Sequence, residues 1–82
     1  MKIYDMDGQR NVSGERIYRM RTRKHITQAD LAARVQTTDV ILEQDAISRI
    51  ERGLRMVQDY ELAVLARILG VSMEWLTSEI ET

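Results

Sequence analysis

The sequence predicts an all-α protein, folded as a compact bundle of five helices. The composition favours helix, because the 82 residues include no proline and only four glycines, and 44% of them are hydrophobic. Apolar residues recur at helical spacing in most segments of the chain. Residues that cap helices precede these segments and glycines follow two of them, so the expected helix ends can be placed one by one.

The first helix is expected to follow an N-terminal arm. Residues 1–12 show no helical period, and they form either a partly disordered arm or a short edge strand. The domain itself should cover residues 13–80. Ser13 can cap its first helix, which then runs to about Lys24 with Ile17 on its apolar side.

A long connection separates the second helix from the third. Thr27 is the expected cap of the second helix, with Asp30 completing a capping box, and this helix should stop near Gln36. Residues 36–43 then break the helical pattern, although an apolar run inside them must be covered. The third helix is expected over about residues 44–52.

Glycines mark the ends of the third and fourth helices. Gly53 and Gly70 stand where helices often end in the left-handed conformation. Asp59 is the expected cap of the fourth helix, and Ser72 is that of the fifth. The apolar side chains expected to face the common core are Ile17, Leu31, Val35, Ile47, Ile50, Leu62, Leu65, Leu69, Val71 and Leu76.

The charges are distributed unevenly along the chain. The net charge is −1, but residues 1–34 carry an excess of four positive charges and residues 35–82 an excess of five negative charges. One side of the molecule should therefore be cationic, which can attract nucleic acid. An ordinary solvated helix surface has a similar composition, so this asymmetry alone does not decide the partner.

The residue types present argue against an enzyme and against a metal site. Cysteine is absent and His25 is the single histidine, so neither a thiolate site nor a histidine cluster can form. We find no nucleophile motif and no glycine-rich phosphate loop, and therefore expect no catalytic residues, no cofactor and no small-molecule ligand. No apolar run reaches the ~20 residues that cross a bilayer, and no signal peptide is evident, so we expect a cytoplasmic protein without membrane contact.

Two segments have the character of the paired helices of a helix-turn-helix. The first is TQADLA over residues 27–32, and the second is AISRIERG over residues 46–53. In the second segment, small, polar and basic residues share one face while Ile47 and Ile50 share the other. Such a helix suits the major groove of DNA, because its inner face can pack and its outer face can donate hydrogen bonds.

These segments, in this order, resemble the Cro/cI-type helix-turn-helix family of phage and bacterial repressors, also called the XRE family. The resemblance covers about residues 13–77 and implies a lambda-repressor-like DNA-binding domain. One departure concerns residues 36–43, which form a longer connection without the usual glycine, as in a long-loop subgroup of the family. The other residues that carry the resemblance are Arg16, Ile17, Arg21 and the run from Leu69 to Leu76.

The resemblance implies phosphate contacts at two places. Gln28 would donate to a phosphate at the start of the second helix, with help from the helix N-terminus. Thr27 beside it is more readily a cap than a contact. Arg52 and Arg55, just after the third helix, suit phosphates that flank the groove, or else form a solvated basic loop.

The resemblance also implies a set of base-reading residues at the start of the third helix: Gln44, Asp45, Ser48 and Arg49. Glutamine can pair with adenine and arginine with guanine, which makes both suited to the groove, although both could also be plain surface residues. Asp45 could accept a hydrogen bond from cytosine, or it could cap the helix, since Glu43 is a poor capping residue.

Two further roles follow from the family pattern. Arg21 and Glu51 correspond to a partly buried salt bridge that links the first and third helices. The C-terminal segment often meets its twin in a dimer, so Trp75, Leu76 and Ile80 are candidate interface residues. Simple closure of the monomer core explains Trp75 equally well.

The sequence therefore predicts a transcriptional regulator, a repressor by family resemblance, that binds a double-stranded DNA operator as a homodimer. The third helix of each subunit would lie in the major groove. The alternative is a helical protein-interaction module on the same scaffold, such as an antitoxin or adaptor. The acidic second half of the chain keeps this alternative open.

Overall fold

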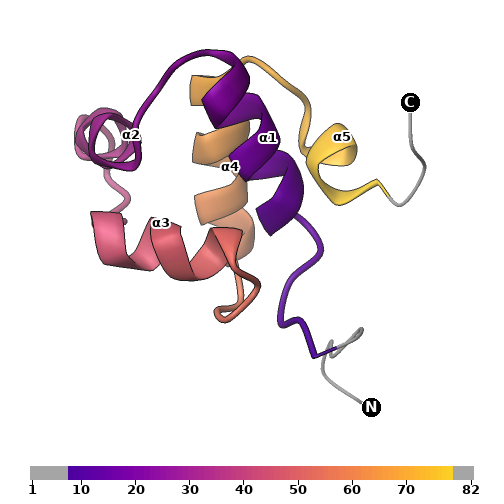
Figure 1. The fold of residues 1–82 in the computed structure, drawn as a ribbon. Coiled ribbons are helices and arrows are strands. Elements are labelled where there is room, and N and C mark those ends of the chain that lie inside the picture. Colours follow the sequence, from indigo (N-terminus) through magenta and orange to yellow (C-terminus); the bar gives the residue numbers. More distant parts are fainter. Residues whose placement is uncertain (1–7, 79–82) are drawn as a thin grey trace.

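The computed structural model describes residues 8–78, and the five helices in this range confirm the predicted all-α bundle (Figure 1). In Figure 1, α1 and α4 lie side by side, α3 crosses below them, and α2 and α5 lie on opposite flanks. Within residues 8–78, no helix is both long and apolar enough to span a membrane. The helices are α1 (Gly14–Arg23), α2 (Gln28–Val35), α3 (Gln44–Glu51), α4 (Asp59–Leu69) and α5 (Met73–Thr77).

One hydrophobic core joins all five helices. Most of the side chains predicted to be in the core are fully buried, and Leu62 and Val71 are partly buried at its edge. The core also contains Ile26, which was not predicted to face it, and Leu42, which belongs to the apolar run that was expected to be covered. These two lie in the connections before α2 and α3, where no helical period exists to indicate which side chain faces inward.

The N-terminus of α1 is capped by a residue that the sequence analysis did not consider. Ser13 occupies the N-cap position, but its side chain makes no capping hydrogen bond, so the predicted role is wrong. Instead, the backbone N–H of Gly14 donates to Oδ1 of Asn11 over 2.7 Å. Asn11 is itself buried, and its Nδ2 donates to the carbonyl oxygens of Ile50 (3.0 Å) and Arg55 (2.8 Å). This one side chain therefore ties the start of α1 to the end of α3.

Two of the other predicted caps are confirmed and one is wrong. Thr27 Oγ1 accepts from the backbone N–H of Asp30 over 3.0 Å, and Ser72 Oγ accepts likewise from Trp75 over 2.9 Å. α4 begins one residue earlier than expected, because Gln58 occupies the N-cap position in place of Asp59. The carboxylate of Glu61 reaches back to accept from the Gln58 backbone N–H over 2.9 Å, and this bond satisfies an otherwise unpaired donor.

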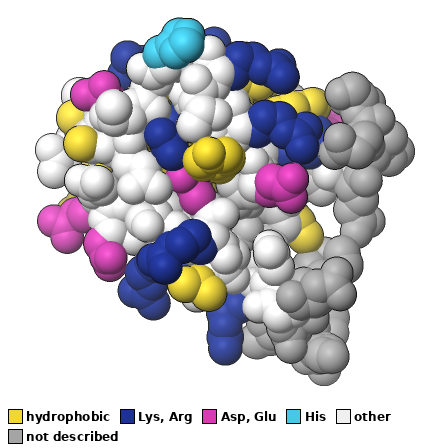
Figure 2. Space-filling view, viewed as in Figure 1, with side chains coloured by type: hydrophobic (Ala, Val, Ile, Leu, Met, Phe, Trp, Pro, Cys, Tyr) yellow, Lys and Arg dark blue, Asp and Glu magenta, His cyan; other side chains and the backbone are white. Residues whose placement is uncertain are grey.

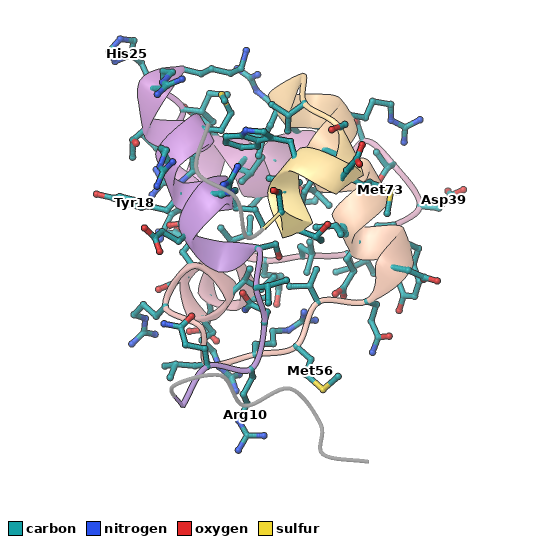
Figure 3. All side chains as sticks on the ribbon, turned by 90° about the vertical axis from the view of Figure 1, so that its right-hand side faces the viewer. Arg10, Tyr18, His25, Asp39, Met56 and Met73 are labelled. Carbon is teal, nitrogen blue, oxygen red and sulfur yellow. The ribbon has the colours of Figure 1, made fainter. Side chains whose placement is uncertain are left out.

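Three of the described helices, α1, α3 and α4, are followed by a residue in the left-handed conformation. Gly53 and Gly70 have φ angles of 75° and 72°, as predicted. His25, after α1, adopts φ 58° without being a glycine, and the N–H of Ile26 then reaches back to the carbonyl of Arg21 over 3.0 Å. His25 projects at one end of the molecule, opposite Arg10 at the other end (Figure 3).

The long connection before α3 is held by hydrogen bonds of Thr38 and by one buried side chain, Leu42. Thr38 Oγ1 donates to the carbonyl oxygen of Val35 over 2.6 Å and accepts from the N–H of Val40 over 3.1 Å. Leu42 is 1% exposed in the core, but Ile41 beside it is 77% exposed, so the expectation that the whole apolar run is covered is wrong at Ile41. These contacts hold the connection against the core, and α3 begins at Gln44 as the sequence predicts.

Candidate nucleic-acid interface

The second and third helices pack against each other and place one edge of α3 in solvent. Ile47 and Ile50 are fully buried, so they fix the rotation of α3 about its axis. Gln44, Asp45 and Arg49 are exposed on the opposite side, and Ser48 is half-buried between them. The predicted base-reading residues therefore come together on one accessible edge.

The start of α3 is acidic and has no side-chain cap. Glu43 occupies the N-cap position and its side chain makes no capping hydrogen bond. Asp45 lies inside the first turn, so the alternative that it caps the helix is wrong. A carboxylate there still interacts favourably with the positive end of the helix dipole. Asp45 is exposed and remains available to accept a hydrogen bond from outside.

The basic residues of this region lie toward the end of α3. Arg49 and Arg52 are both exposed, and Arg52 Nε makes a long hydrogen bond of 3.4 Å to the carbonyl oxygen of Ser48. Figure 2 shows Lys and Arg side chains over the lower part of this face and acidic side chains at its left edge. The charge along α3 thus changes from acidic at its start to basic at its end, and the face as a whole is mixed.

A buried network connects the start of α2 to the end of α3. Arg21 of α1 makes two hydrogen bonds to the carboxylate of Glu51, from Nε to Oε2 over 2.6 Å and from Nη2 to Oε1 over 2.9 Å. The same Oε1 accepts from Nε2 of Gln28 over 3.0 Å. Hydrogen bonding to Glu51, opposed in part by burial, raises the pKa of Arg21 above its ordinary value. Gln28, the predicted phosphate donor, therefore has a hydrogen-bond partner within the protein.

Arg55 has a partner that the sequence analysis did not anticipate. Its Nη1 and Nη2 bind the two carboxylate oxygens of Glu61 at 2.9 and 3.0 Å, and Nη1 also donates to the carbonyl oxygen of Met56. Burial alone would raise the pKa of Glu61, but the hydrogen bonds from Arg55 and from the Gln58 backbone outweigh it and lower that pKa. Arg55 thus fastens the α3–α4 connection to α4, and a phosphate would have to compete with Glu61 for it.

Two of the three candidate dimer residues at the C-terminus, Trp75 and Leu76, make contacts within the monomer. Leu76 is fully buried in the core, so its side chain is not available to a partner. The guanidinium of Arg16 lies 4.7 Å from the centre of the Trp75 ring, and its Nη1 donates to the Trp75 carbonyl oxygen over 3.2 Å. Arg16, which the sequence analysis assigned only to the resemblance, is 5% exposed and holds α5 against α1. Ile80 lies outside the described residues.

Residues 17–76 match the family model described as helix-turn-helix. This chain belongs to the helix-turn-helix family. A solved structure with the same fold is the P22 c2 repressor protein in complex with a synthetic operator. The two sequences are 28% identical, and the structures superimpose with a TM-score of 0.72. The match covers 85% of this chain and 98% of the repressor chain. The search of curated proteins found no match.

The family and the solved repressor confirm the resemblance to Cro/cI-type regulators. The protein is accordingly a DNA-binding transcriptional regulator of the helix-turn-helix class and not an enzyme. The buried faces of α2 and α3 and the exposed edge of α3 are the features that such a fold requires.

Proposed function

We propose that this helix-turn-helix protein represses transcription by binding an operator as a homodimer, with α3 of each subunit in the major groove. The observation that carries the proposal is the rotation of α3. Ile47 and Ile50 are sealed in the core, while Gln44 and Arg49 stand free on the outer edge. A groove-reading helix needs this division between a packed face and a hydrogen-bonding face.

The predicted DNA-binding residues divide into base contacts and phosphate contacts in this proposal. Gln44 reads adenine and Arg49 reads guanine, each through two hydrogen bonds to the base edge. Ser48 lies between them on the same edge, and Asp45 accepts from the amino group of a cytosine. Gln28 at the start of α2 and Arg52 at the end of α3 bind flanking phosphates. The other two residues of the predicted set, Thr27 and Arg55, act within the protein as a helix cap and a structural ion pair.

The homodimer would place two α3 helices ~34 Å apart, in successive major grooves on one face of the duplex. Since Leu76 is buried, we propose a different surface for the dimer contact. Leu54 and Met56 are 50% and 47% exposed just after α3, and Met56 lies near Arg10 at one end of the molecule (Figure 3). A contact here would join the two subunits beside their DNA-reading helices. If this proposal holds, the protein acts where the DNA is. For a phage or bacterial regulator, that compartment is the cytoplasm.

The proposal is tested by selecting a binding site from a pool of random duplexes with the wild-type protein. Gln44→Ala and Arg49→Ala should each weaken binding to the selected duplex by about 5- to 150-fold and relax preference at one base position. Arg67→Ala, which removes an exposed arginine from α4, is the matched control and should leave binding unchanged.

Salt dependence provides a second measurement on the same duplex. Arg52→Ala should reduce the slope of log affinity against log salt by about one, because it removes one phosphate contact. If the wild-type protein shows no salt-dependent binding to any duplex, regulation through DNA is excluded. In that case the alternative, a protein-interaction module that uses the same scaffold, is the better account of the acidic start of α3.

A further inference from the structure

The buried carboxylate of Glu51 contacts more than the arginine that balances its charge. Its side chain is 4% exposed and that of Arg21 is 10% exposed, so water competes little for either group. Arg21 is fixed in turn, because its Nη1 donates to the carbonyl oxygen of Ile26 over 2.9 Å. Glu51 is thus held rigidly at the junction of α1, α2 and α3, and its Oε1 faces the side chain of Gln28.

We propose that Glu51 is a positioning residue for DNA binding, acting by holding the side-chain amide of Gln28 in place for a phosphate. The proposal rests on the proposed function, in which Gln28 is a phosphate donor. A carboxylate can only accept hydrogen bonds, so Glu51 selects the orientation in which Nε2 of Gln28 faces it. The amide nitrogen carries two hydrogens, and Glu51 takes one of them. The second remains to be donated to a phosphate oxygen.

The advantage of this arrangement is entropic. A free glutamine side chain loses rotamer freedom when it is immobilised on DNA, and that loss weakens binding. In the proposal Gln28 gives up this freedom before DNA binds, because its amide donates to a buried acceptor that is itself paired with Arg21. The same contact ties the N-terminus of α2 to the C-terminus of α3, which sets the phosphate donor relative to the base-reading edge.

The direction of the expected effect separates positioning from electrostatics. Glu51 is an acid near the proposed DNA surface, so neutralising it removes a repulsion and by charge alone should tighten binding to a polyanion. If Glu51 positions Gln28, Glu51→Gln should instead weaken binding of the folded protein. We expect a loss of about 3- to 10-fold, corresponding to the cost of ordering one flexible side chain.

The experiment is a double-mutant cycle on the duplex selected by the wild-type protein. Affinities are measured for the wild type, Glu51→Gln, Gln28→Met and the double variant, at temperatures where thermal melts show each protein folded. Glu51→Gln should weaken binding when Gln28 is present. When residue 28 is methionine the loss should disappear, and binding should be unchanged or slightly tighter because one negative charge is removed. Unchanged or tighter binding by Glu51→Gln in the protein that keeps Gln28 would overturn the proposal. An equal loss in both backgrounds would also overturn it, since Glu51 would then act by another route.

Glu61→Gln is the matched control. Glu61 is also a buried acid paired with an arginine, and the substitution changes the charge equally, but the hydrogen bonds that Glu61 makes go to α4 and the α3–α4 connection. It should lower stability without weakening DNA binding. A loss of affinity as large as that of Glu51→Gln would show that loosening any buried ion pair has this effect, which would refute positioning by Glu51.

A second measurement needs no substitution at Glu51 and no DNA. In the free wild-type protein, the order parameter of the side-chain amide of Gln28, measured by NMR, should be high. The exposed Gln36, at the other end of α2, provides the mobile reference. If the Gln28 amide is as mobile as that of Gln36, the proposal fails even if DNA binding is observed. If no duplex binds the wild type, the proposed function fails on its own evidence, and with it any role of Glu51 in DNA binding.

Discussion

Arg55 and Glu61 form a two-bond ion pair, at 2.9 and 3.0 Å, that locks the α3–α4 connection to the first turn of α4. Glu61 is nearly buried, with a side chain that is 5% exposed, whereas the side chain of Arg55 is 28% exposed. The same carboxylate caps α4 by accepting from the Gln58 backbone. One buried acid therefore performs two structural tasks at the point where the chain leaves α3.

This ion pair makes the stability of the fold depend on pH. The pKa of Glu61 is lowered in the folded protein, so its contribution is complete above the ordinary glutamate pKa, about 4.3, and is lost as the pH falls through the folded value. We expect Glu61→Gln to cost about 1–3 kcal/mol at pH 7. When both proteins are unfolded in urea, the difference between their free energies of unfolding should shrink as the pH falls below 5. Glu74→Gln, at an exposed site, is the control. If the stability difference between wild type and Glu61→Gln does not change with pH, this account is contradicted.

Gly14 is required by packing rather than by backbone conformation. A Cβ added there would overlap the carbonyl oxygen of Ile50 and lie 2.9 Å from Oδ1 of Asn11. Helix propensity alone predicts that alanine would stabilise α1 by ~1 kcal/mol. The contact with α3 predicts the opposite sign, a loss of about 1–3 kcal/mol, because backbone must shift to make room. Chemical denaturation of Gly14→Ala distinguishes the two by sign alone.

Asn11 should be the most sensitive residue before α1. Its side chain makes three hydrogen bonds to backbone groups of residues 14, 50 and 55. Asn11→Ala should therefore lower the free energy of unfolding by about 2–4 kcal/mol, since buried groups lose their partners. Asn11→Asp keeps the acceptor for Gly14 but turns a carboxylate oxygen toward two carbonyl oxygens, so it should also destabilise at pH 7. A loss below ~0.5 kcal/mol for the alanine variant would be within the range of ordinary surface substitutions and would refute this role.

His25 offers a route to a more stable protein. Its φ of 58° lies in the left-handed region, where a side chain with a Cβ is strained. We expect His25→Gly to raise the free energy of unfolding by about 0.5–1 kcal/mol. His25→Ala keeps the Cβ and should change little, which makes it the control. Equal melting temperatures for the glycine variant and the wild type would show that the strain is negligible.

Local patterns in the sequence predicted much of the fold and of the exposed edge of α3. The limits of α3, the caps at Thr27 and Ser72, and the left-handed glycines all follow from the order of neighbouring residues. The burial of Ile47 and Ile50, which leaves Arg49 outside, follows from the helical period. The caps and helix ends depend on contacts within a few residues, and the helical period fixes which side chains share a face, so the sequence alone predicts them.

Tertiary structure decided which polar side chains would be buried and with which partners. Asn11 caps α1 because α3 ends beside it, and Arg16 covers Trp75 because α5, packed against α4, places Trp75 within its reach. Arg55 is tied to Glu61, and Gln28 to Glu51, in place of the open surface that the sequence suggested for both. A polar residue can be buried only where a partner satisfies it. When that partner comes from a distant element, its identity is set by the packing of the helices, which no local pattern records.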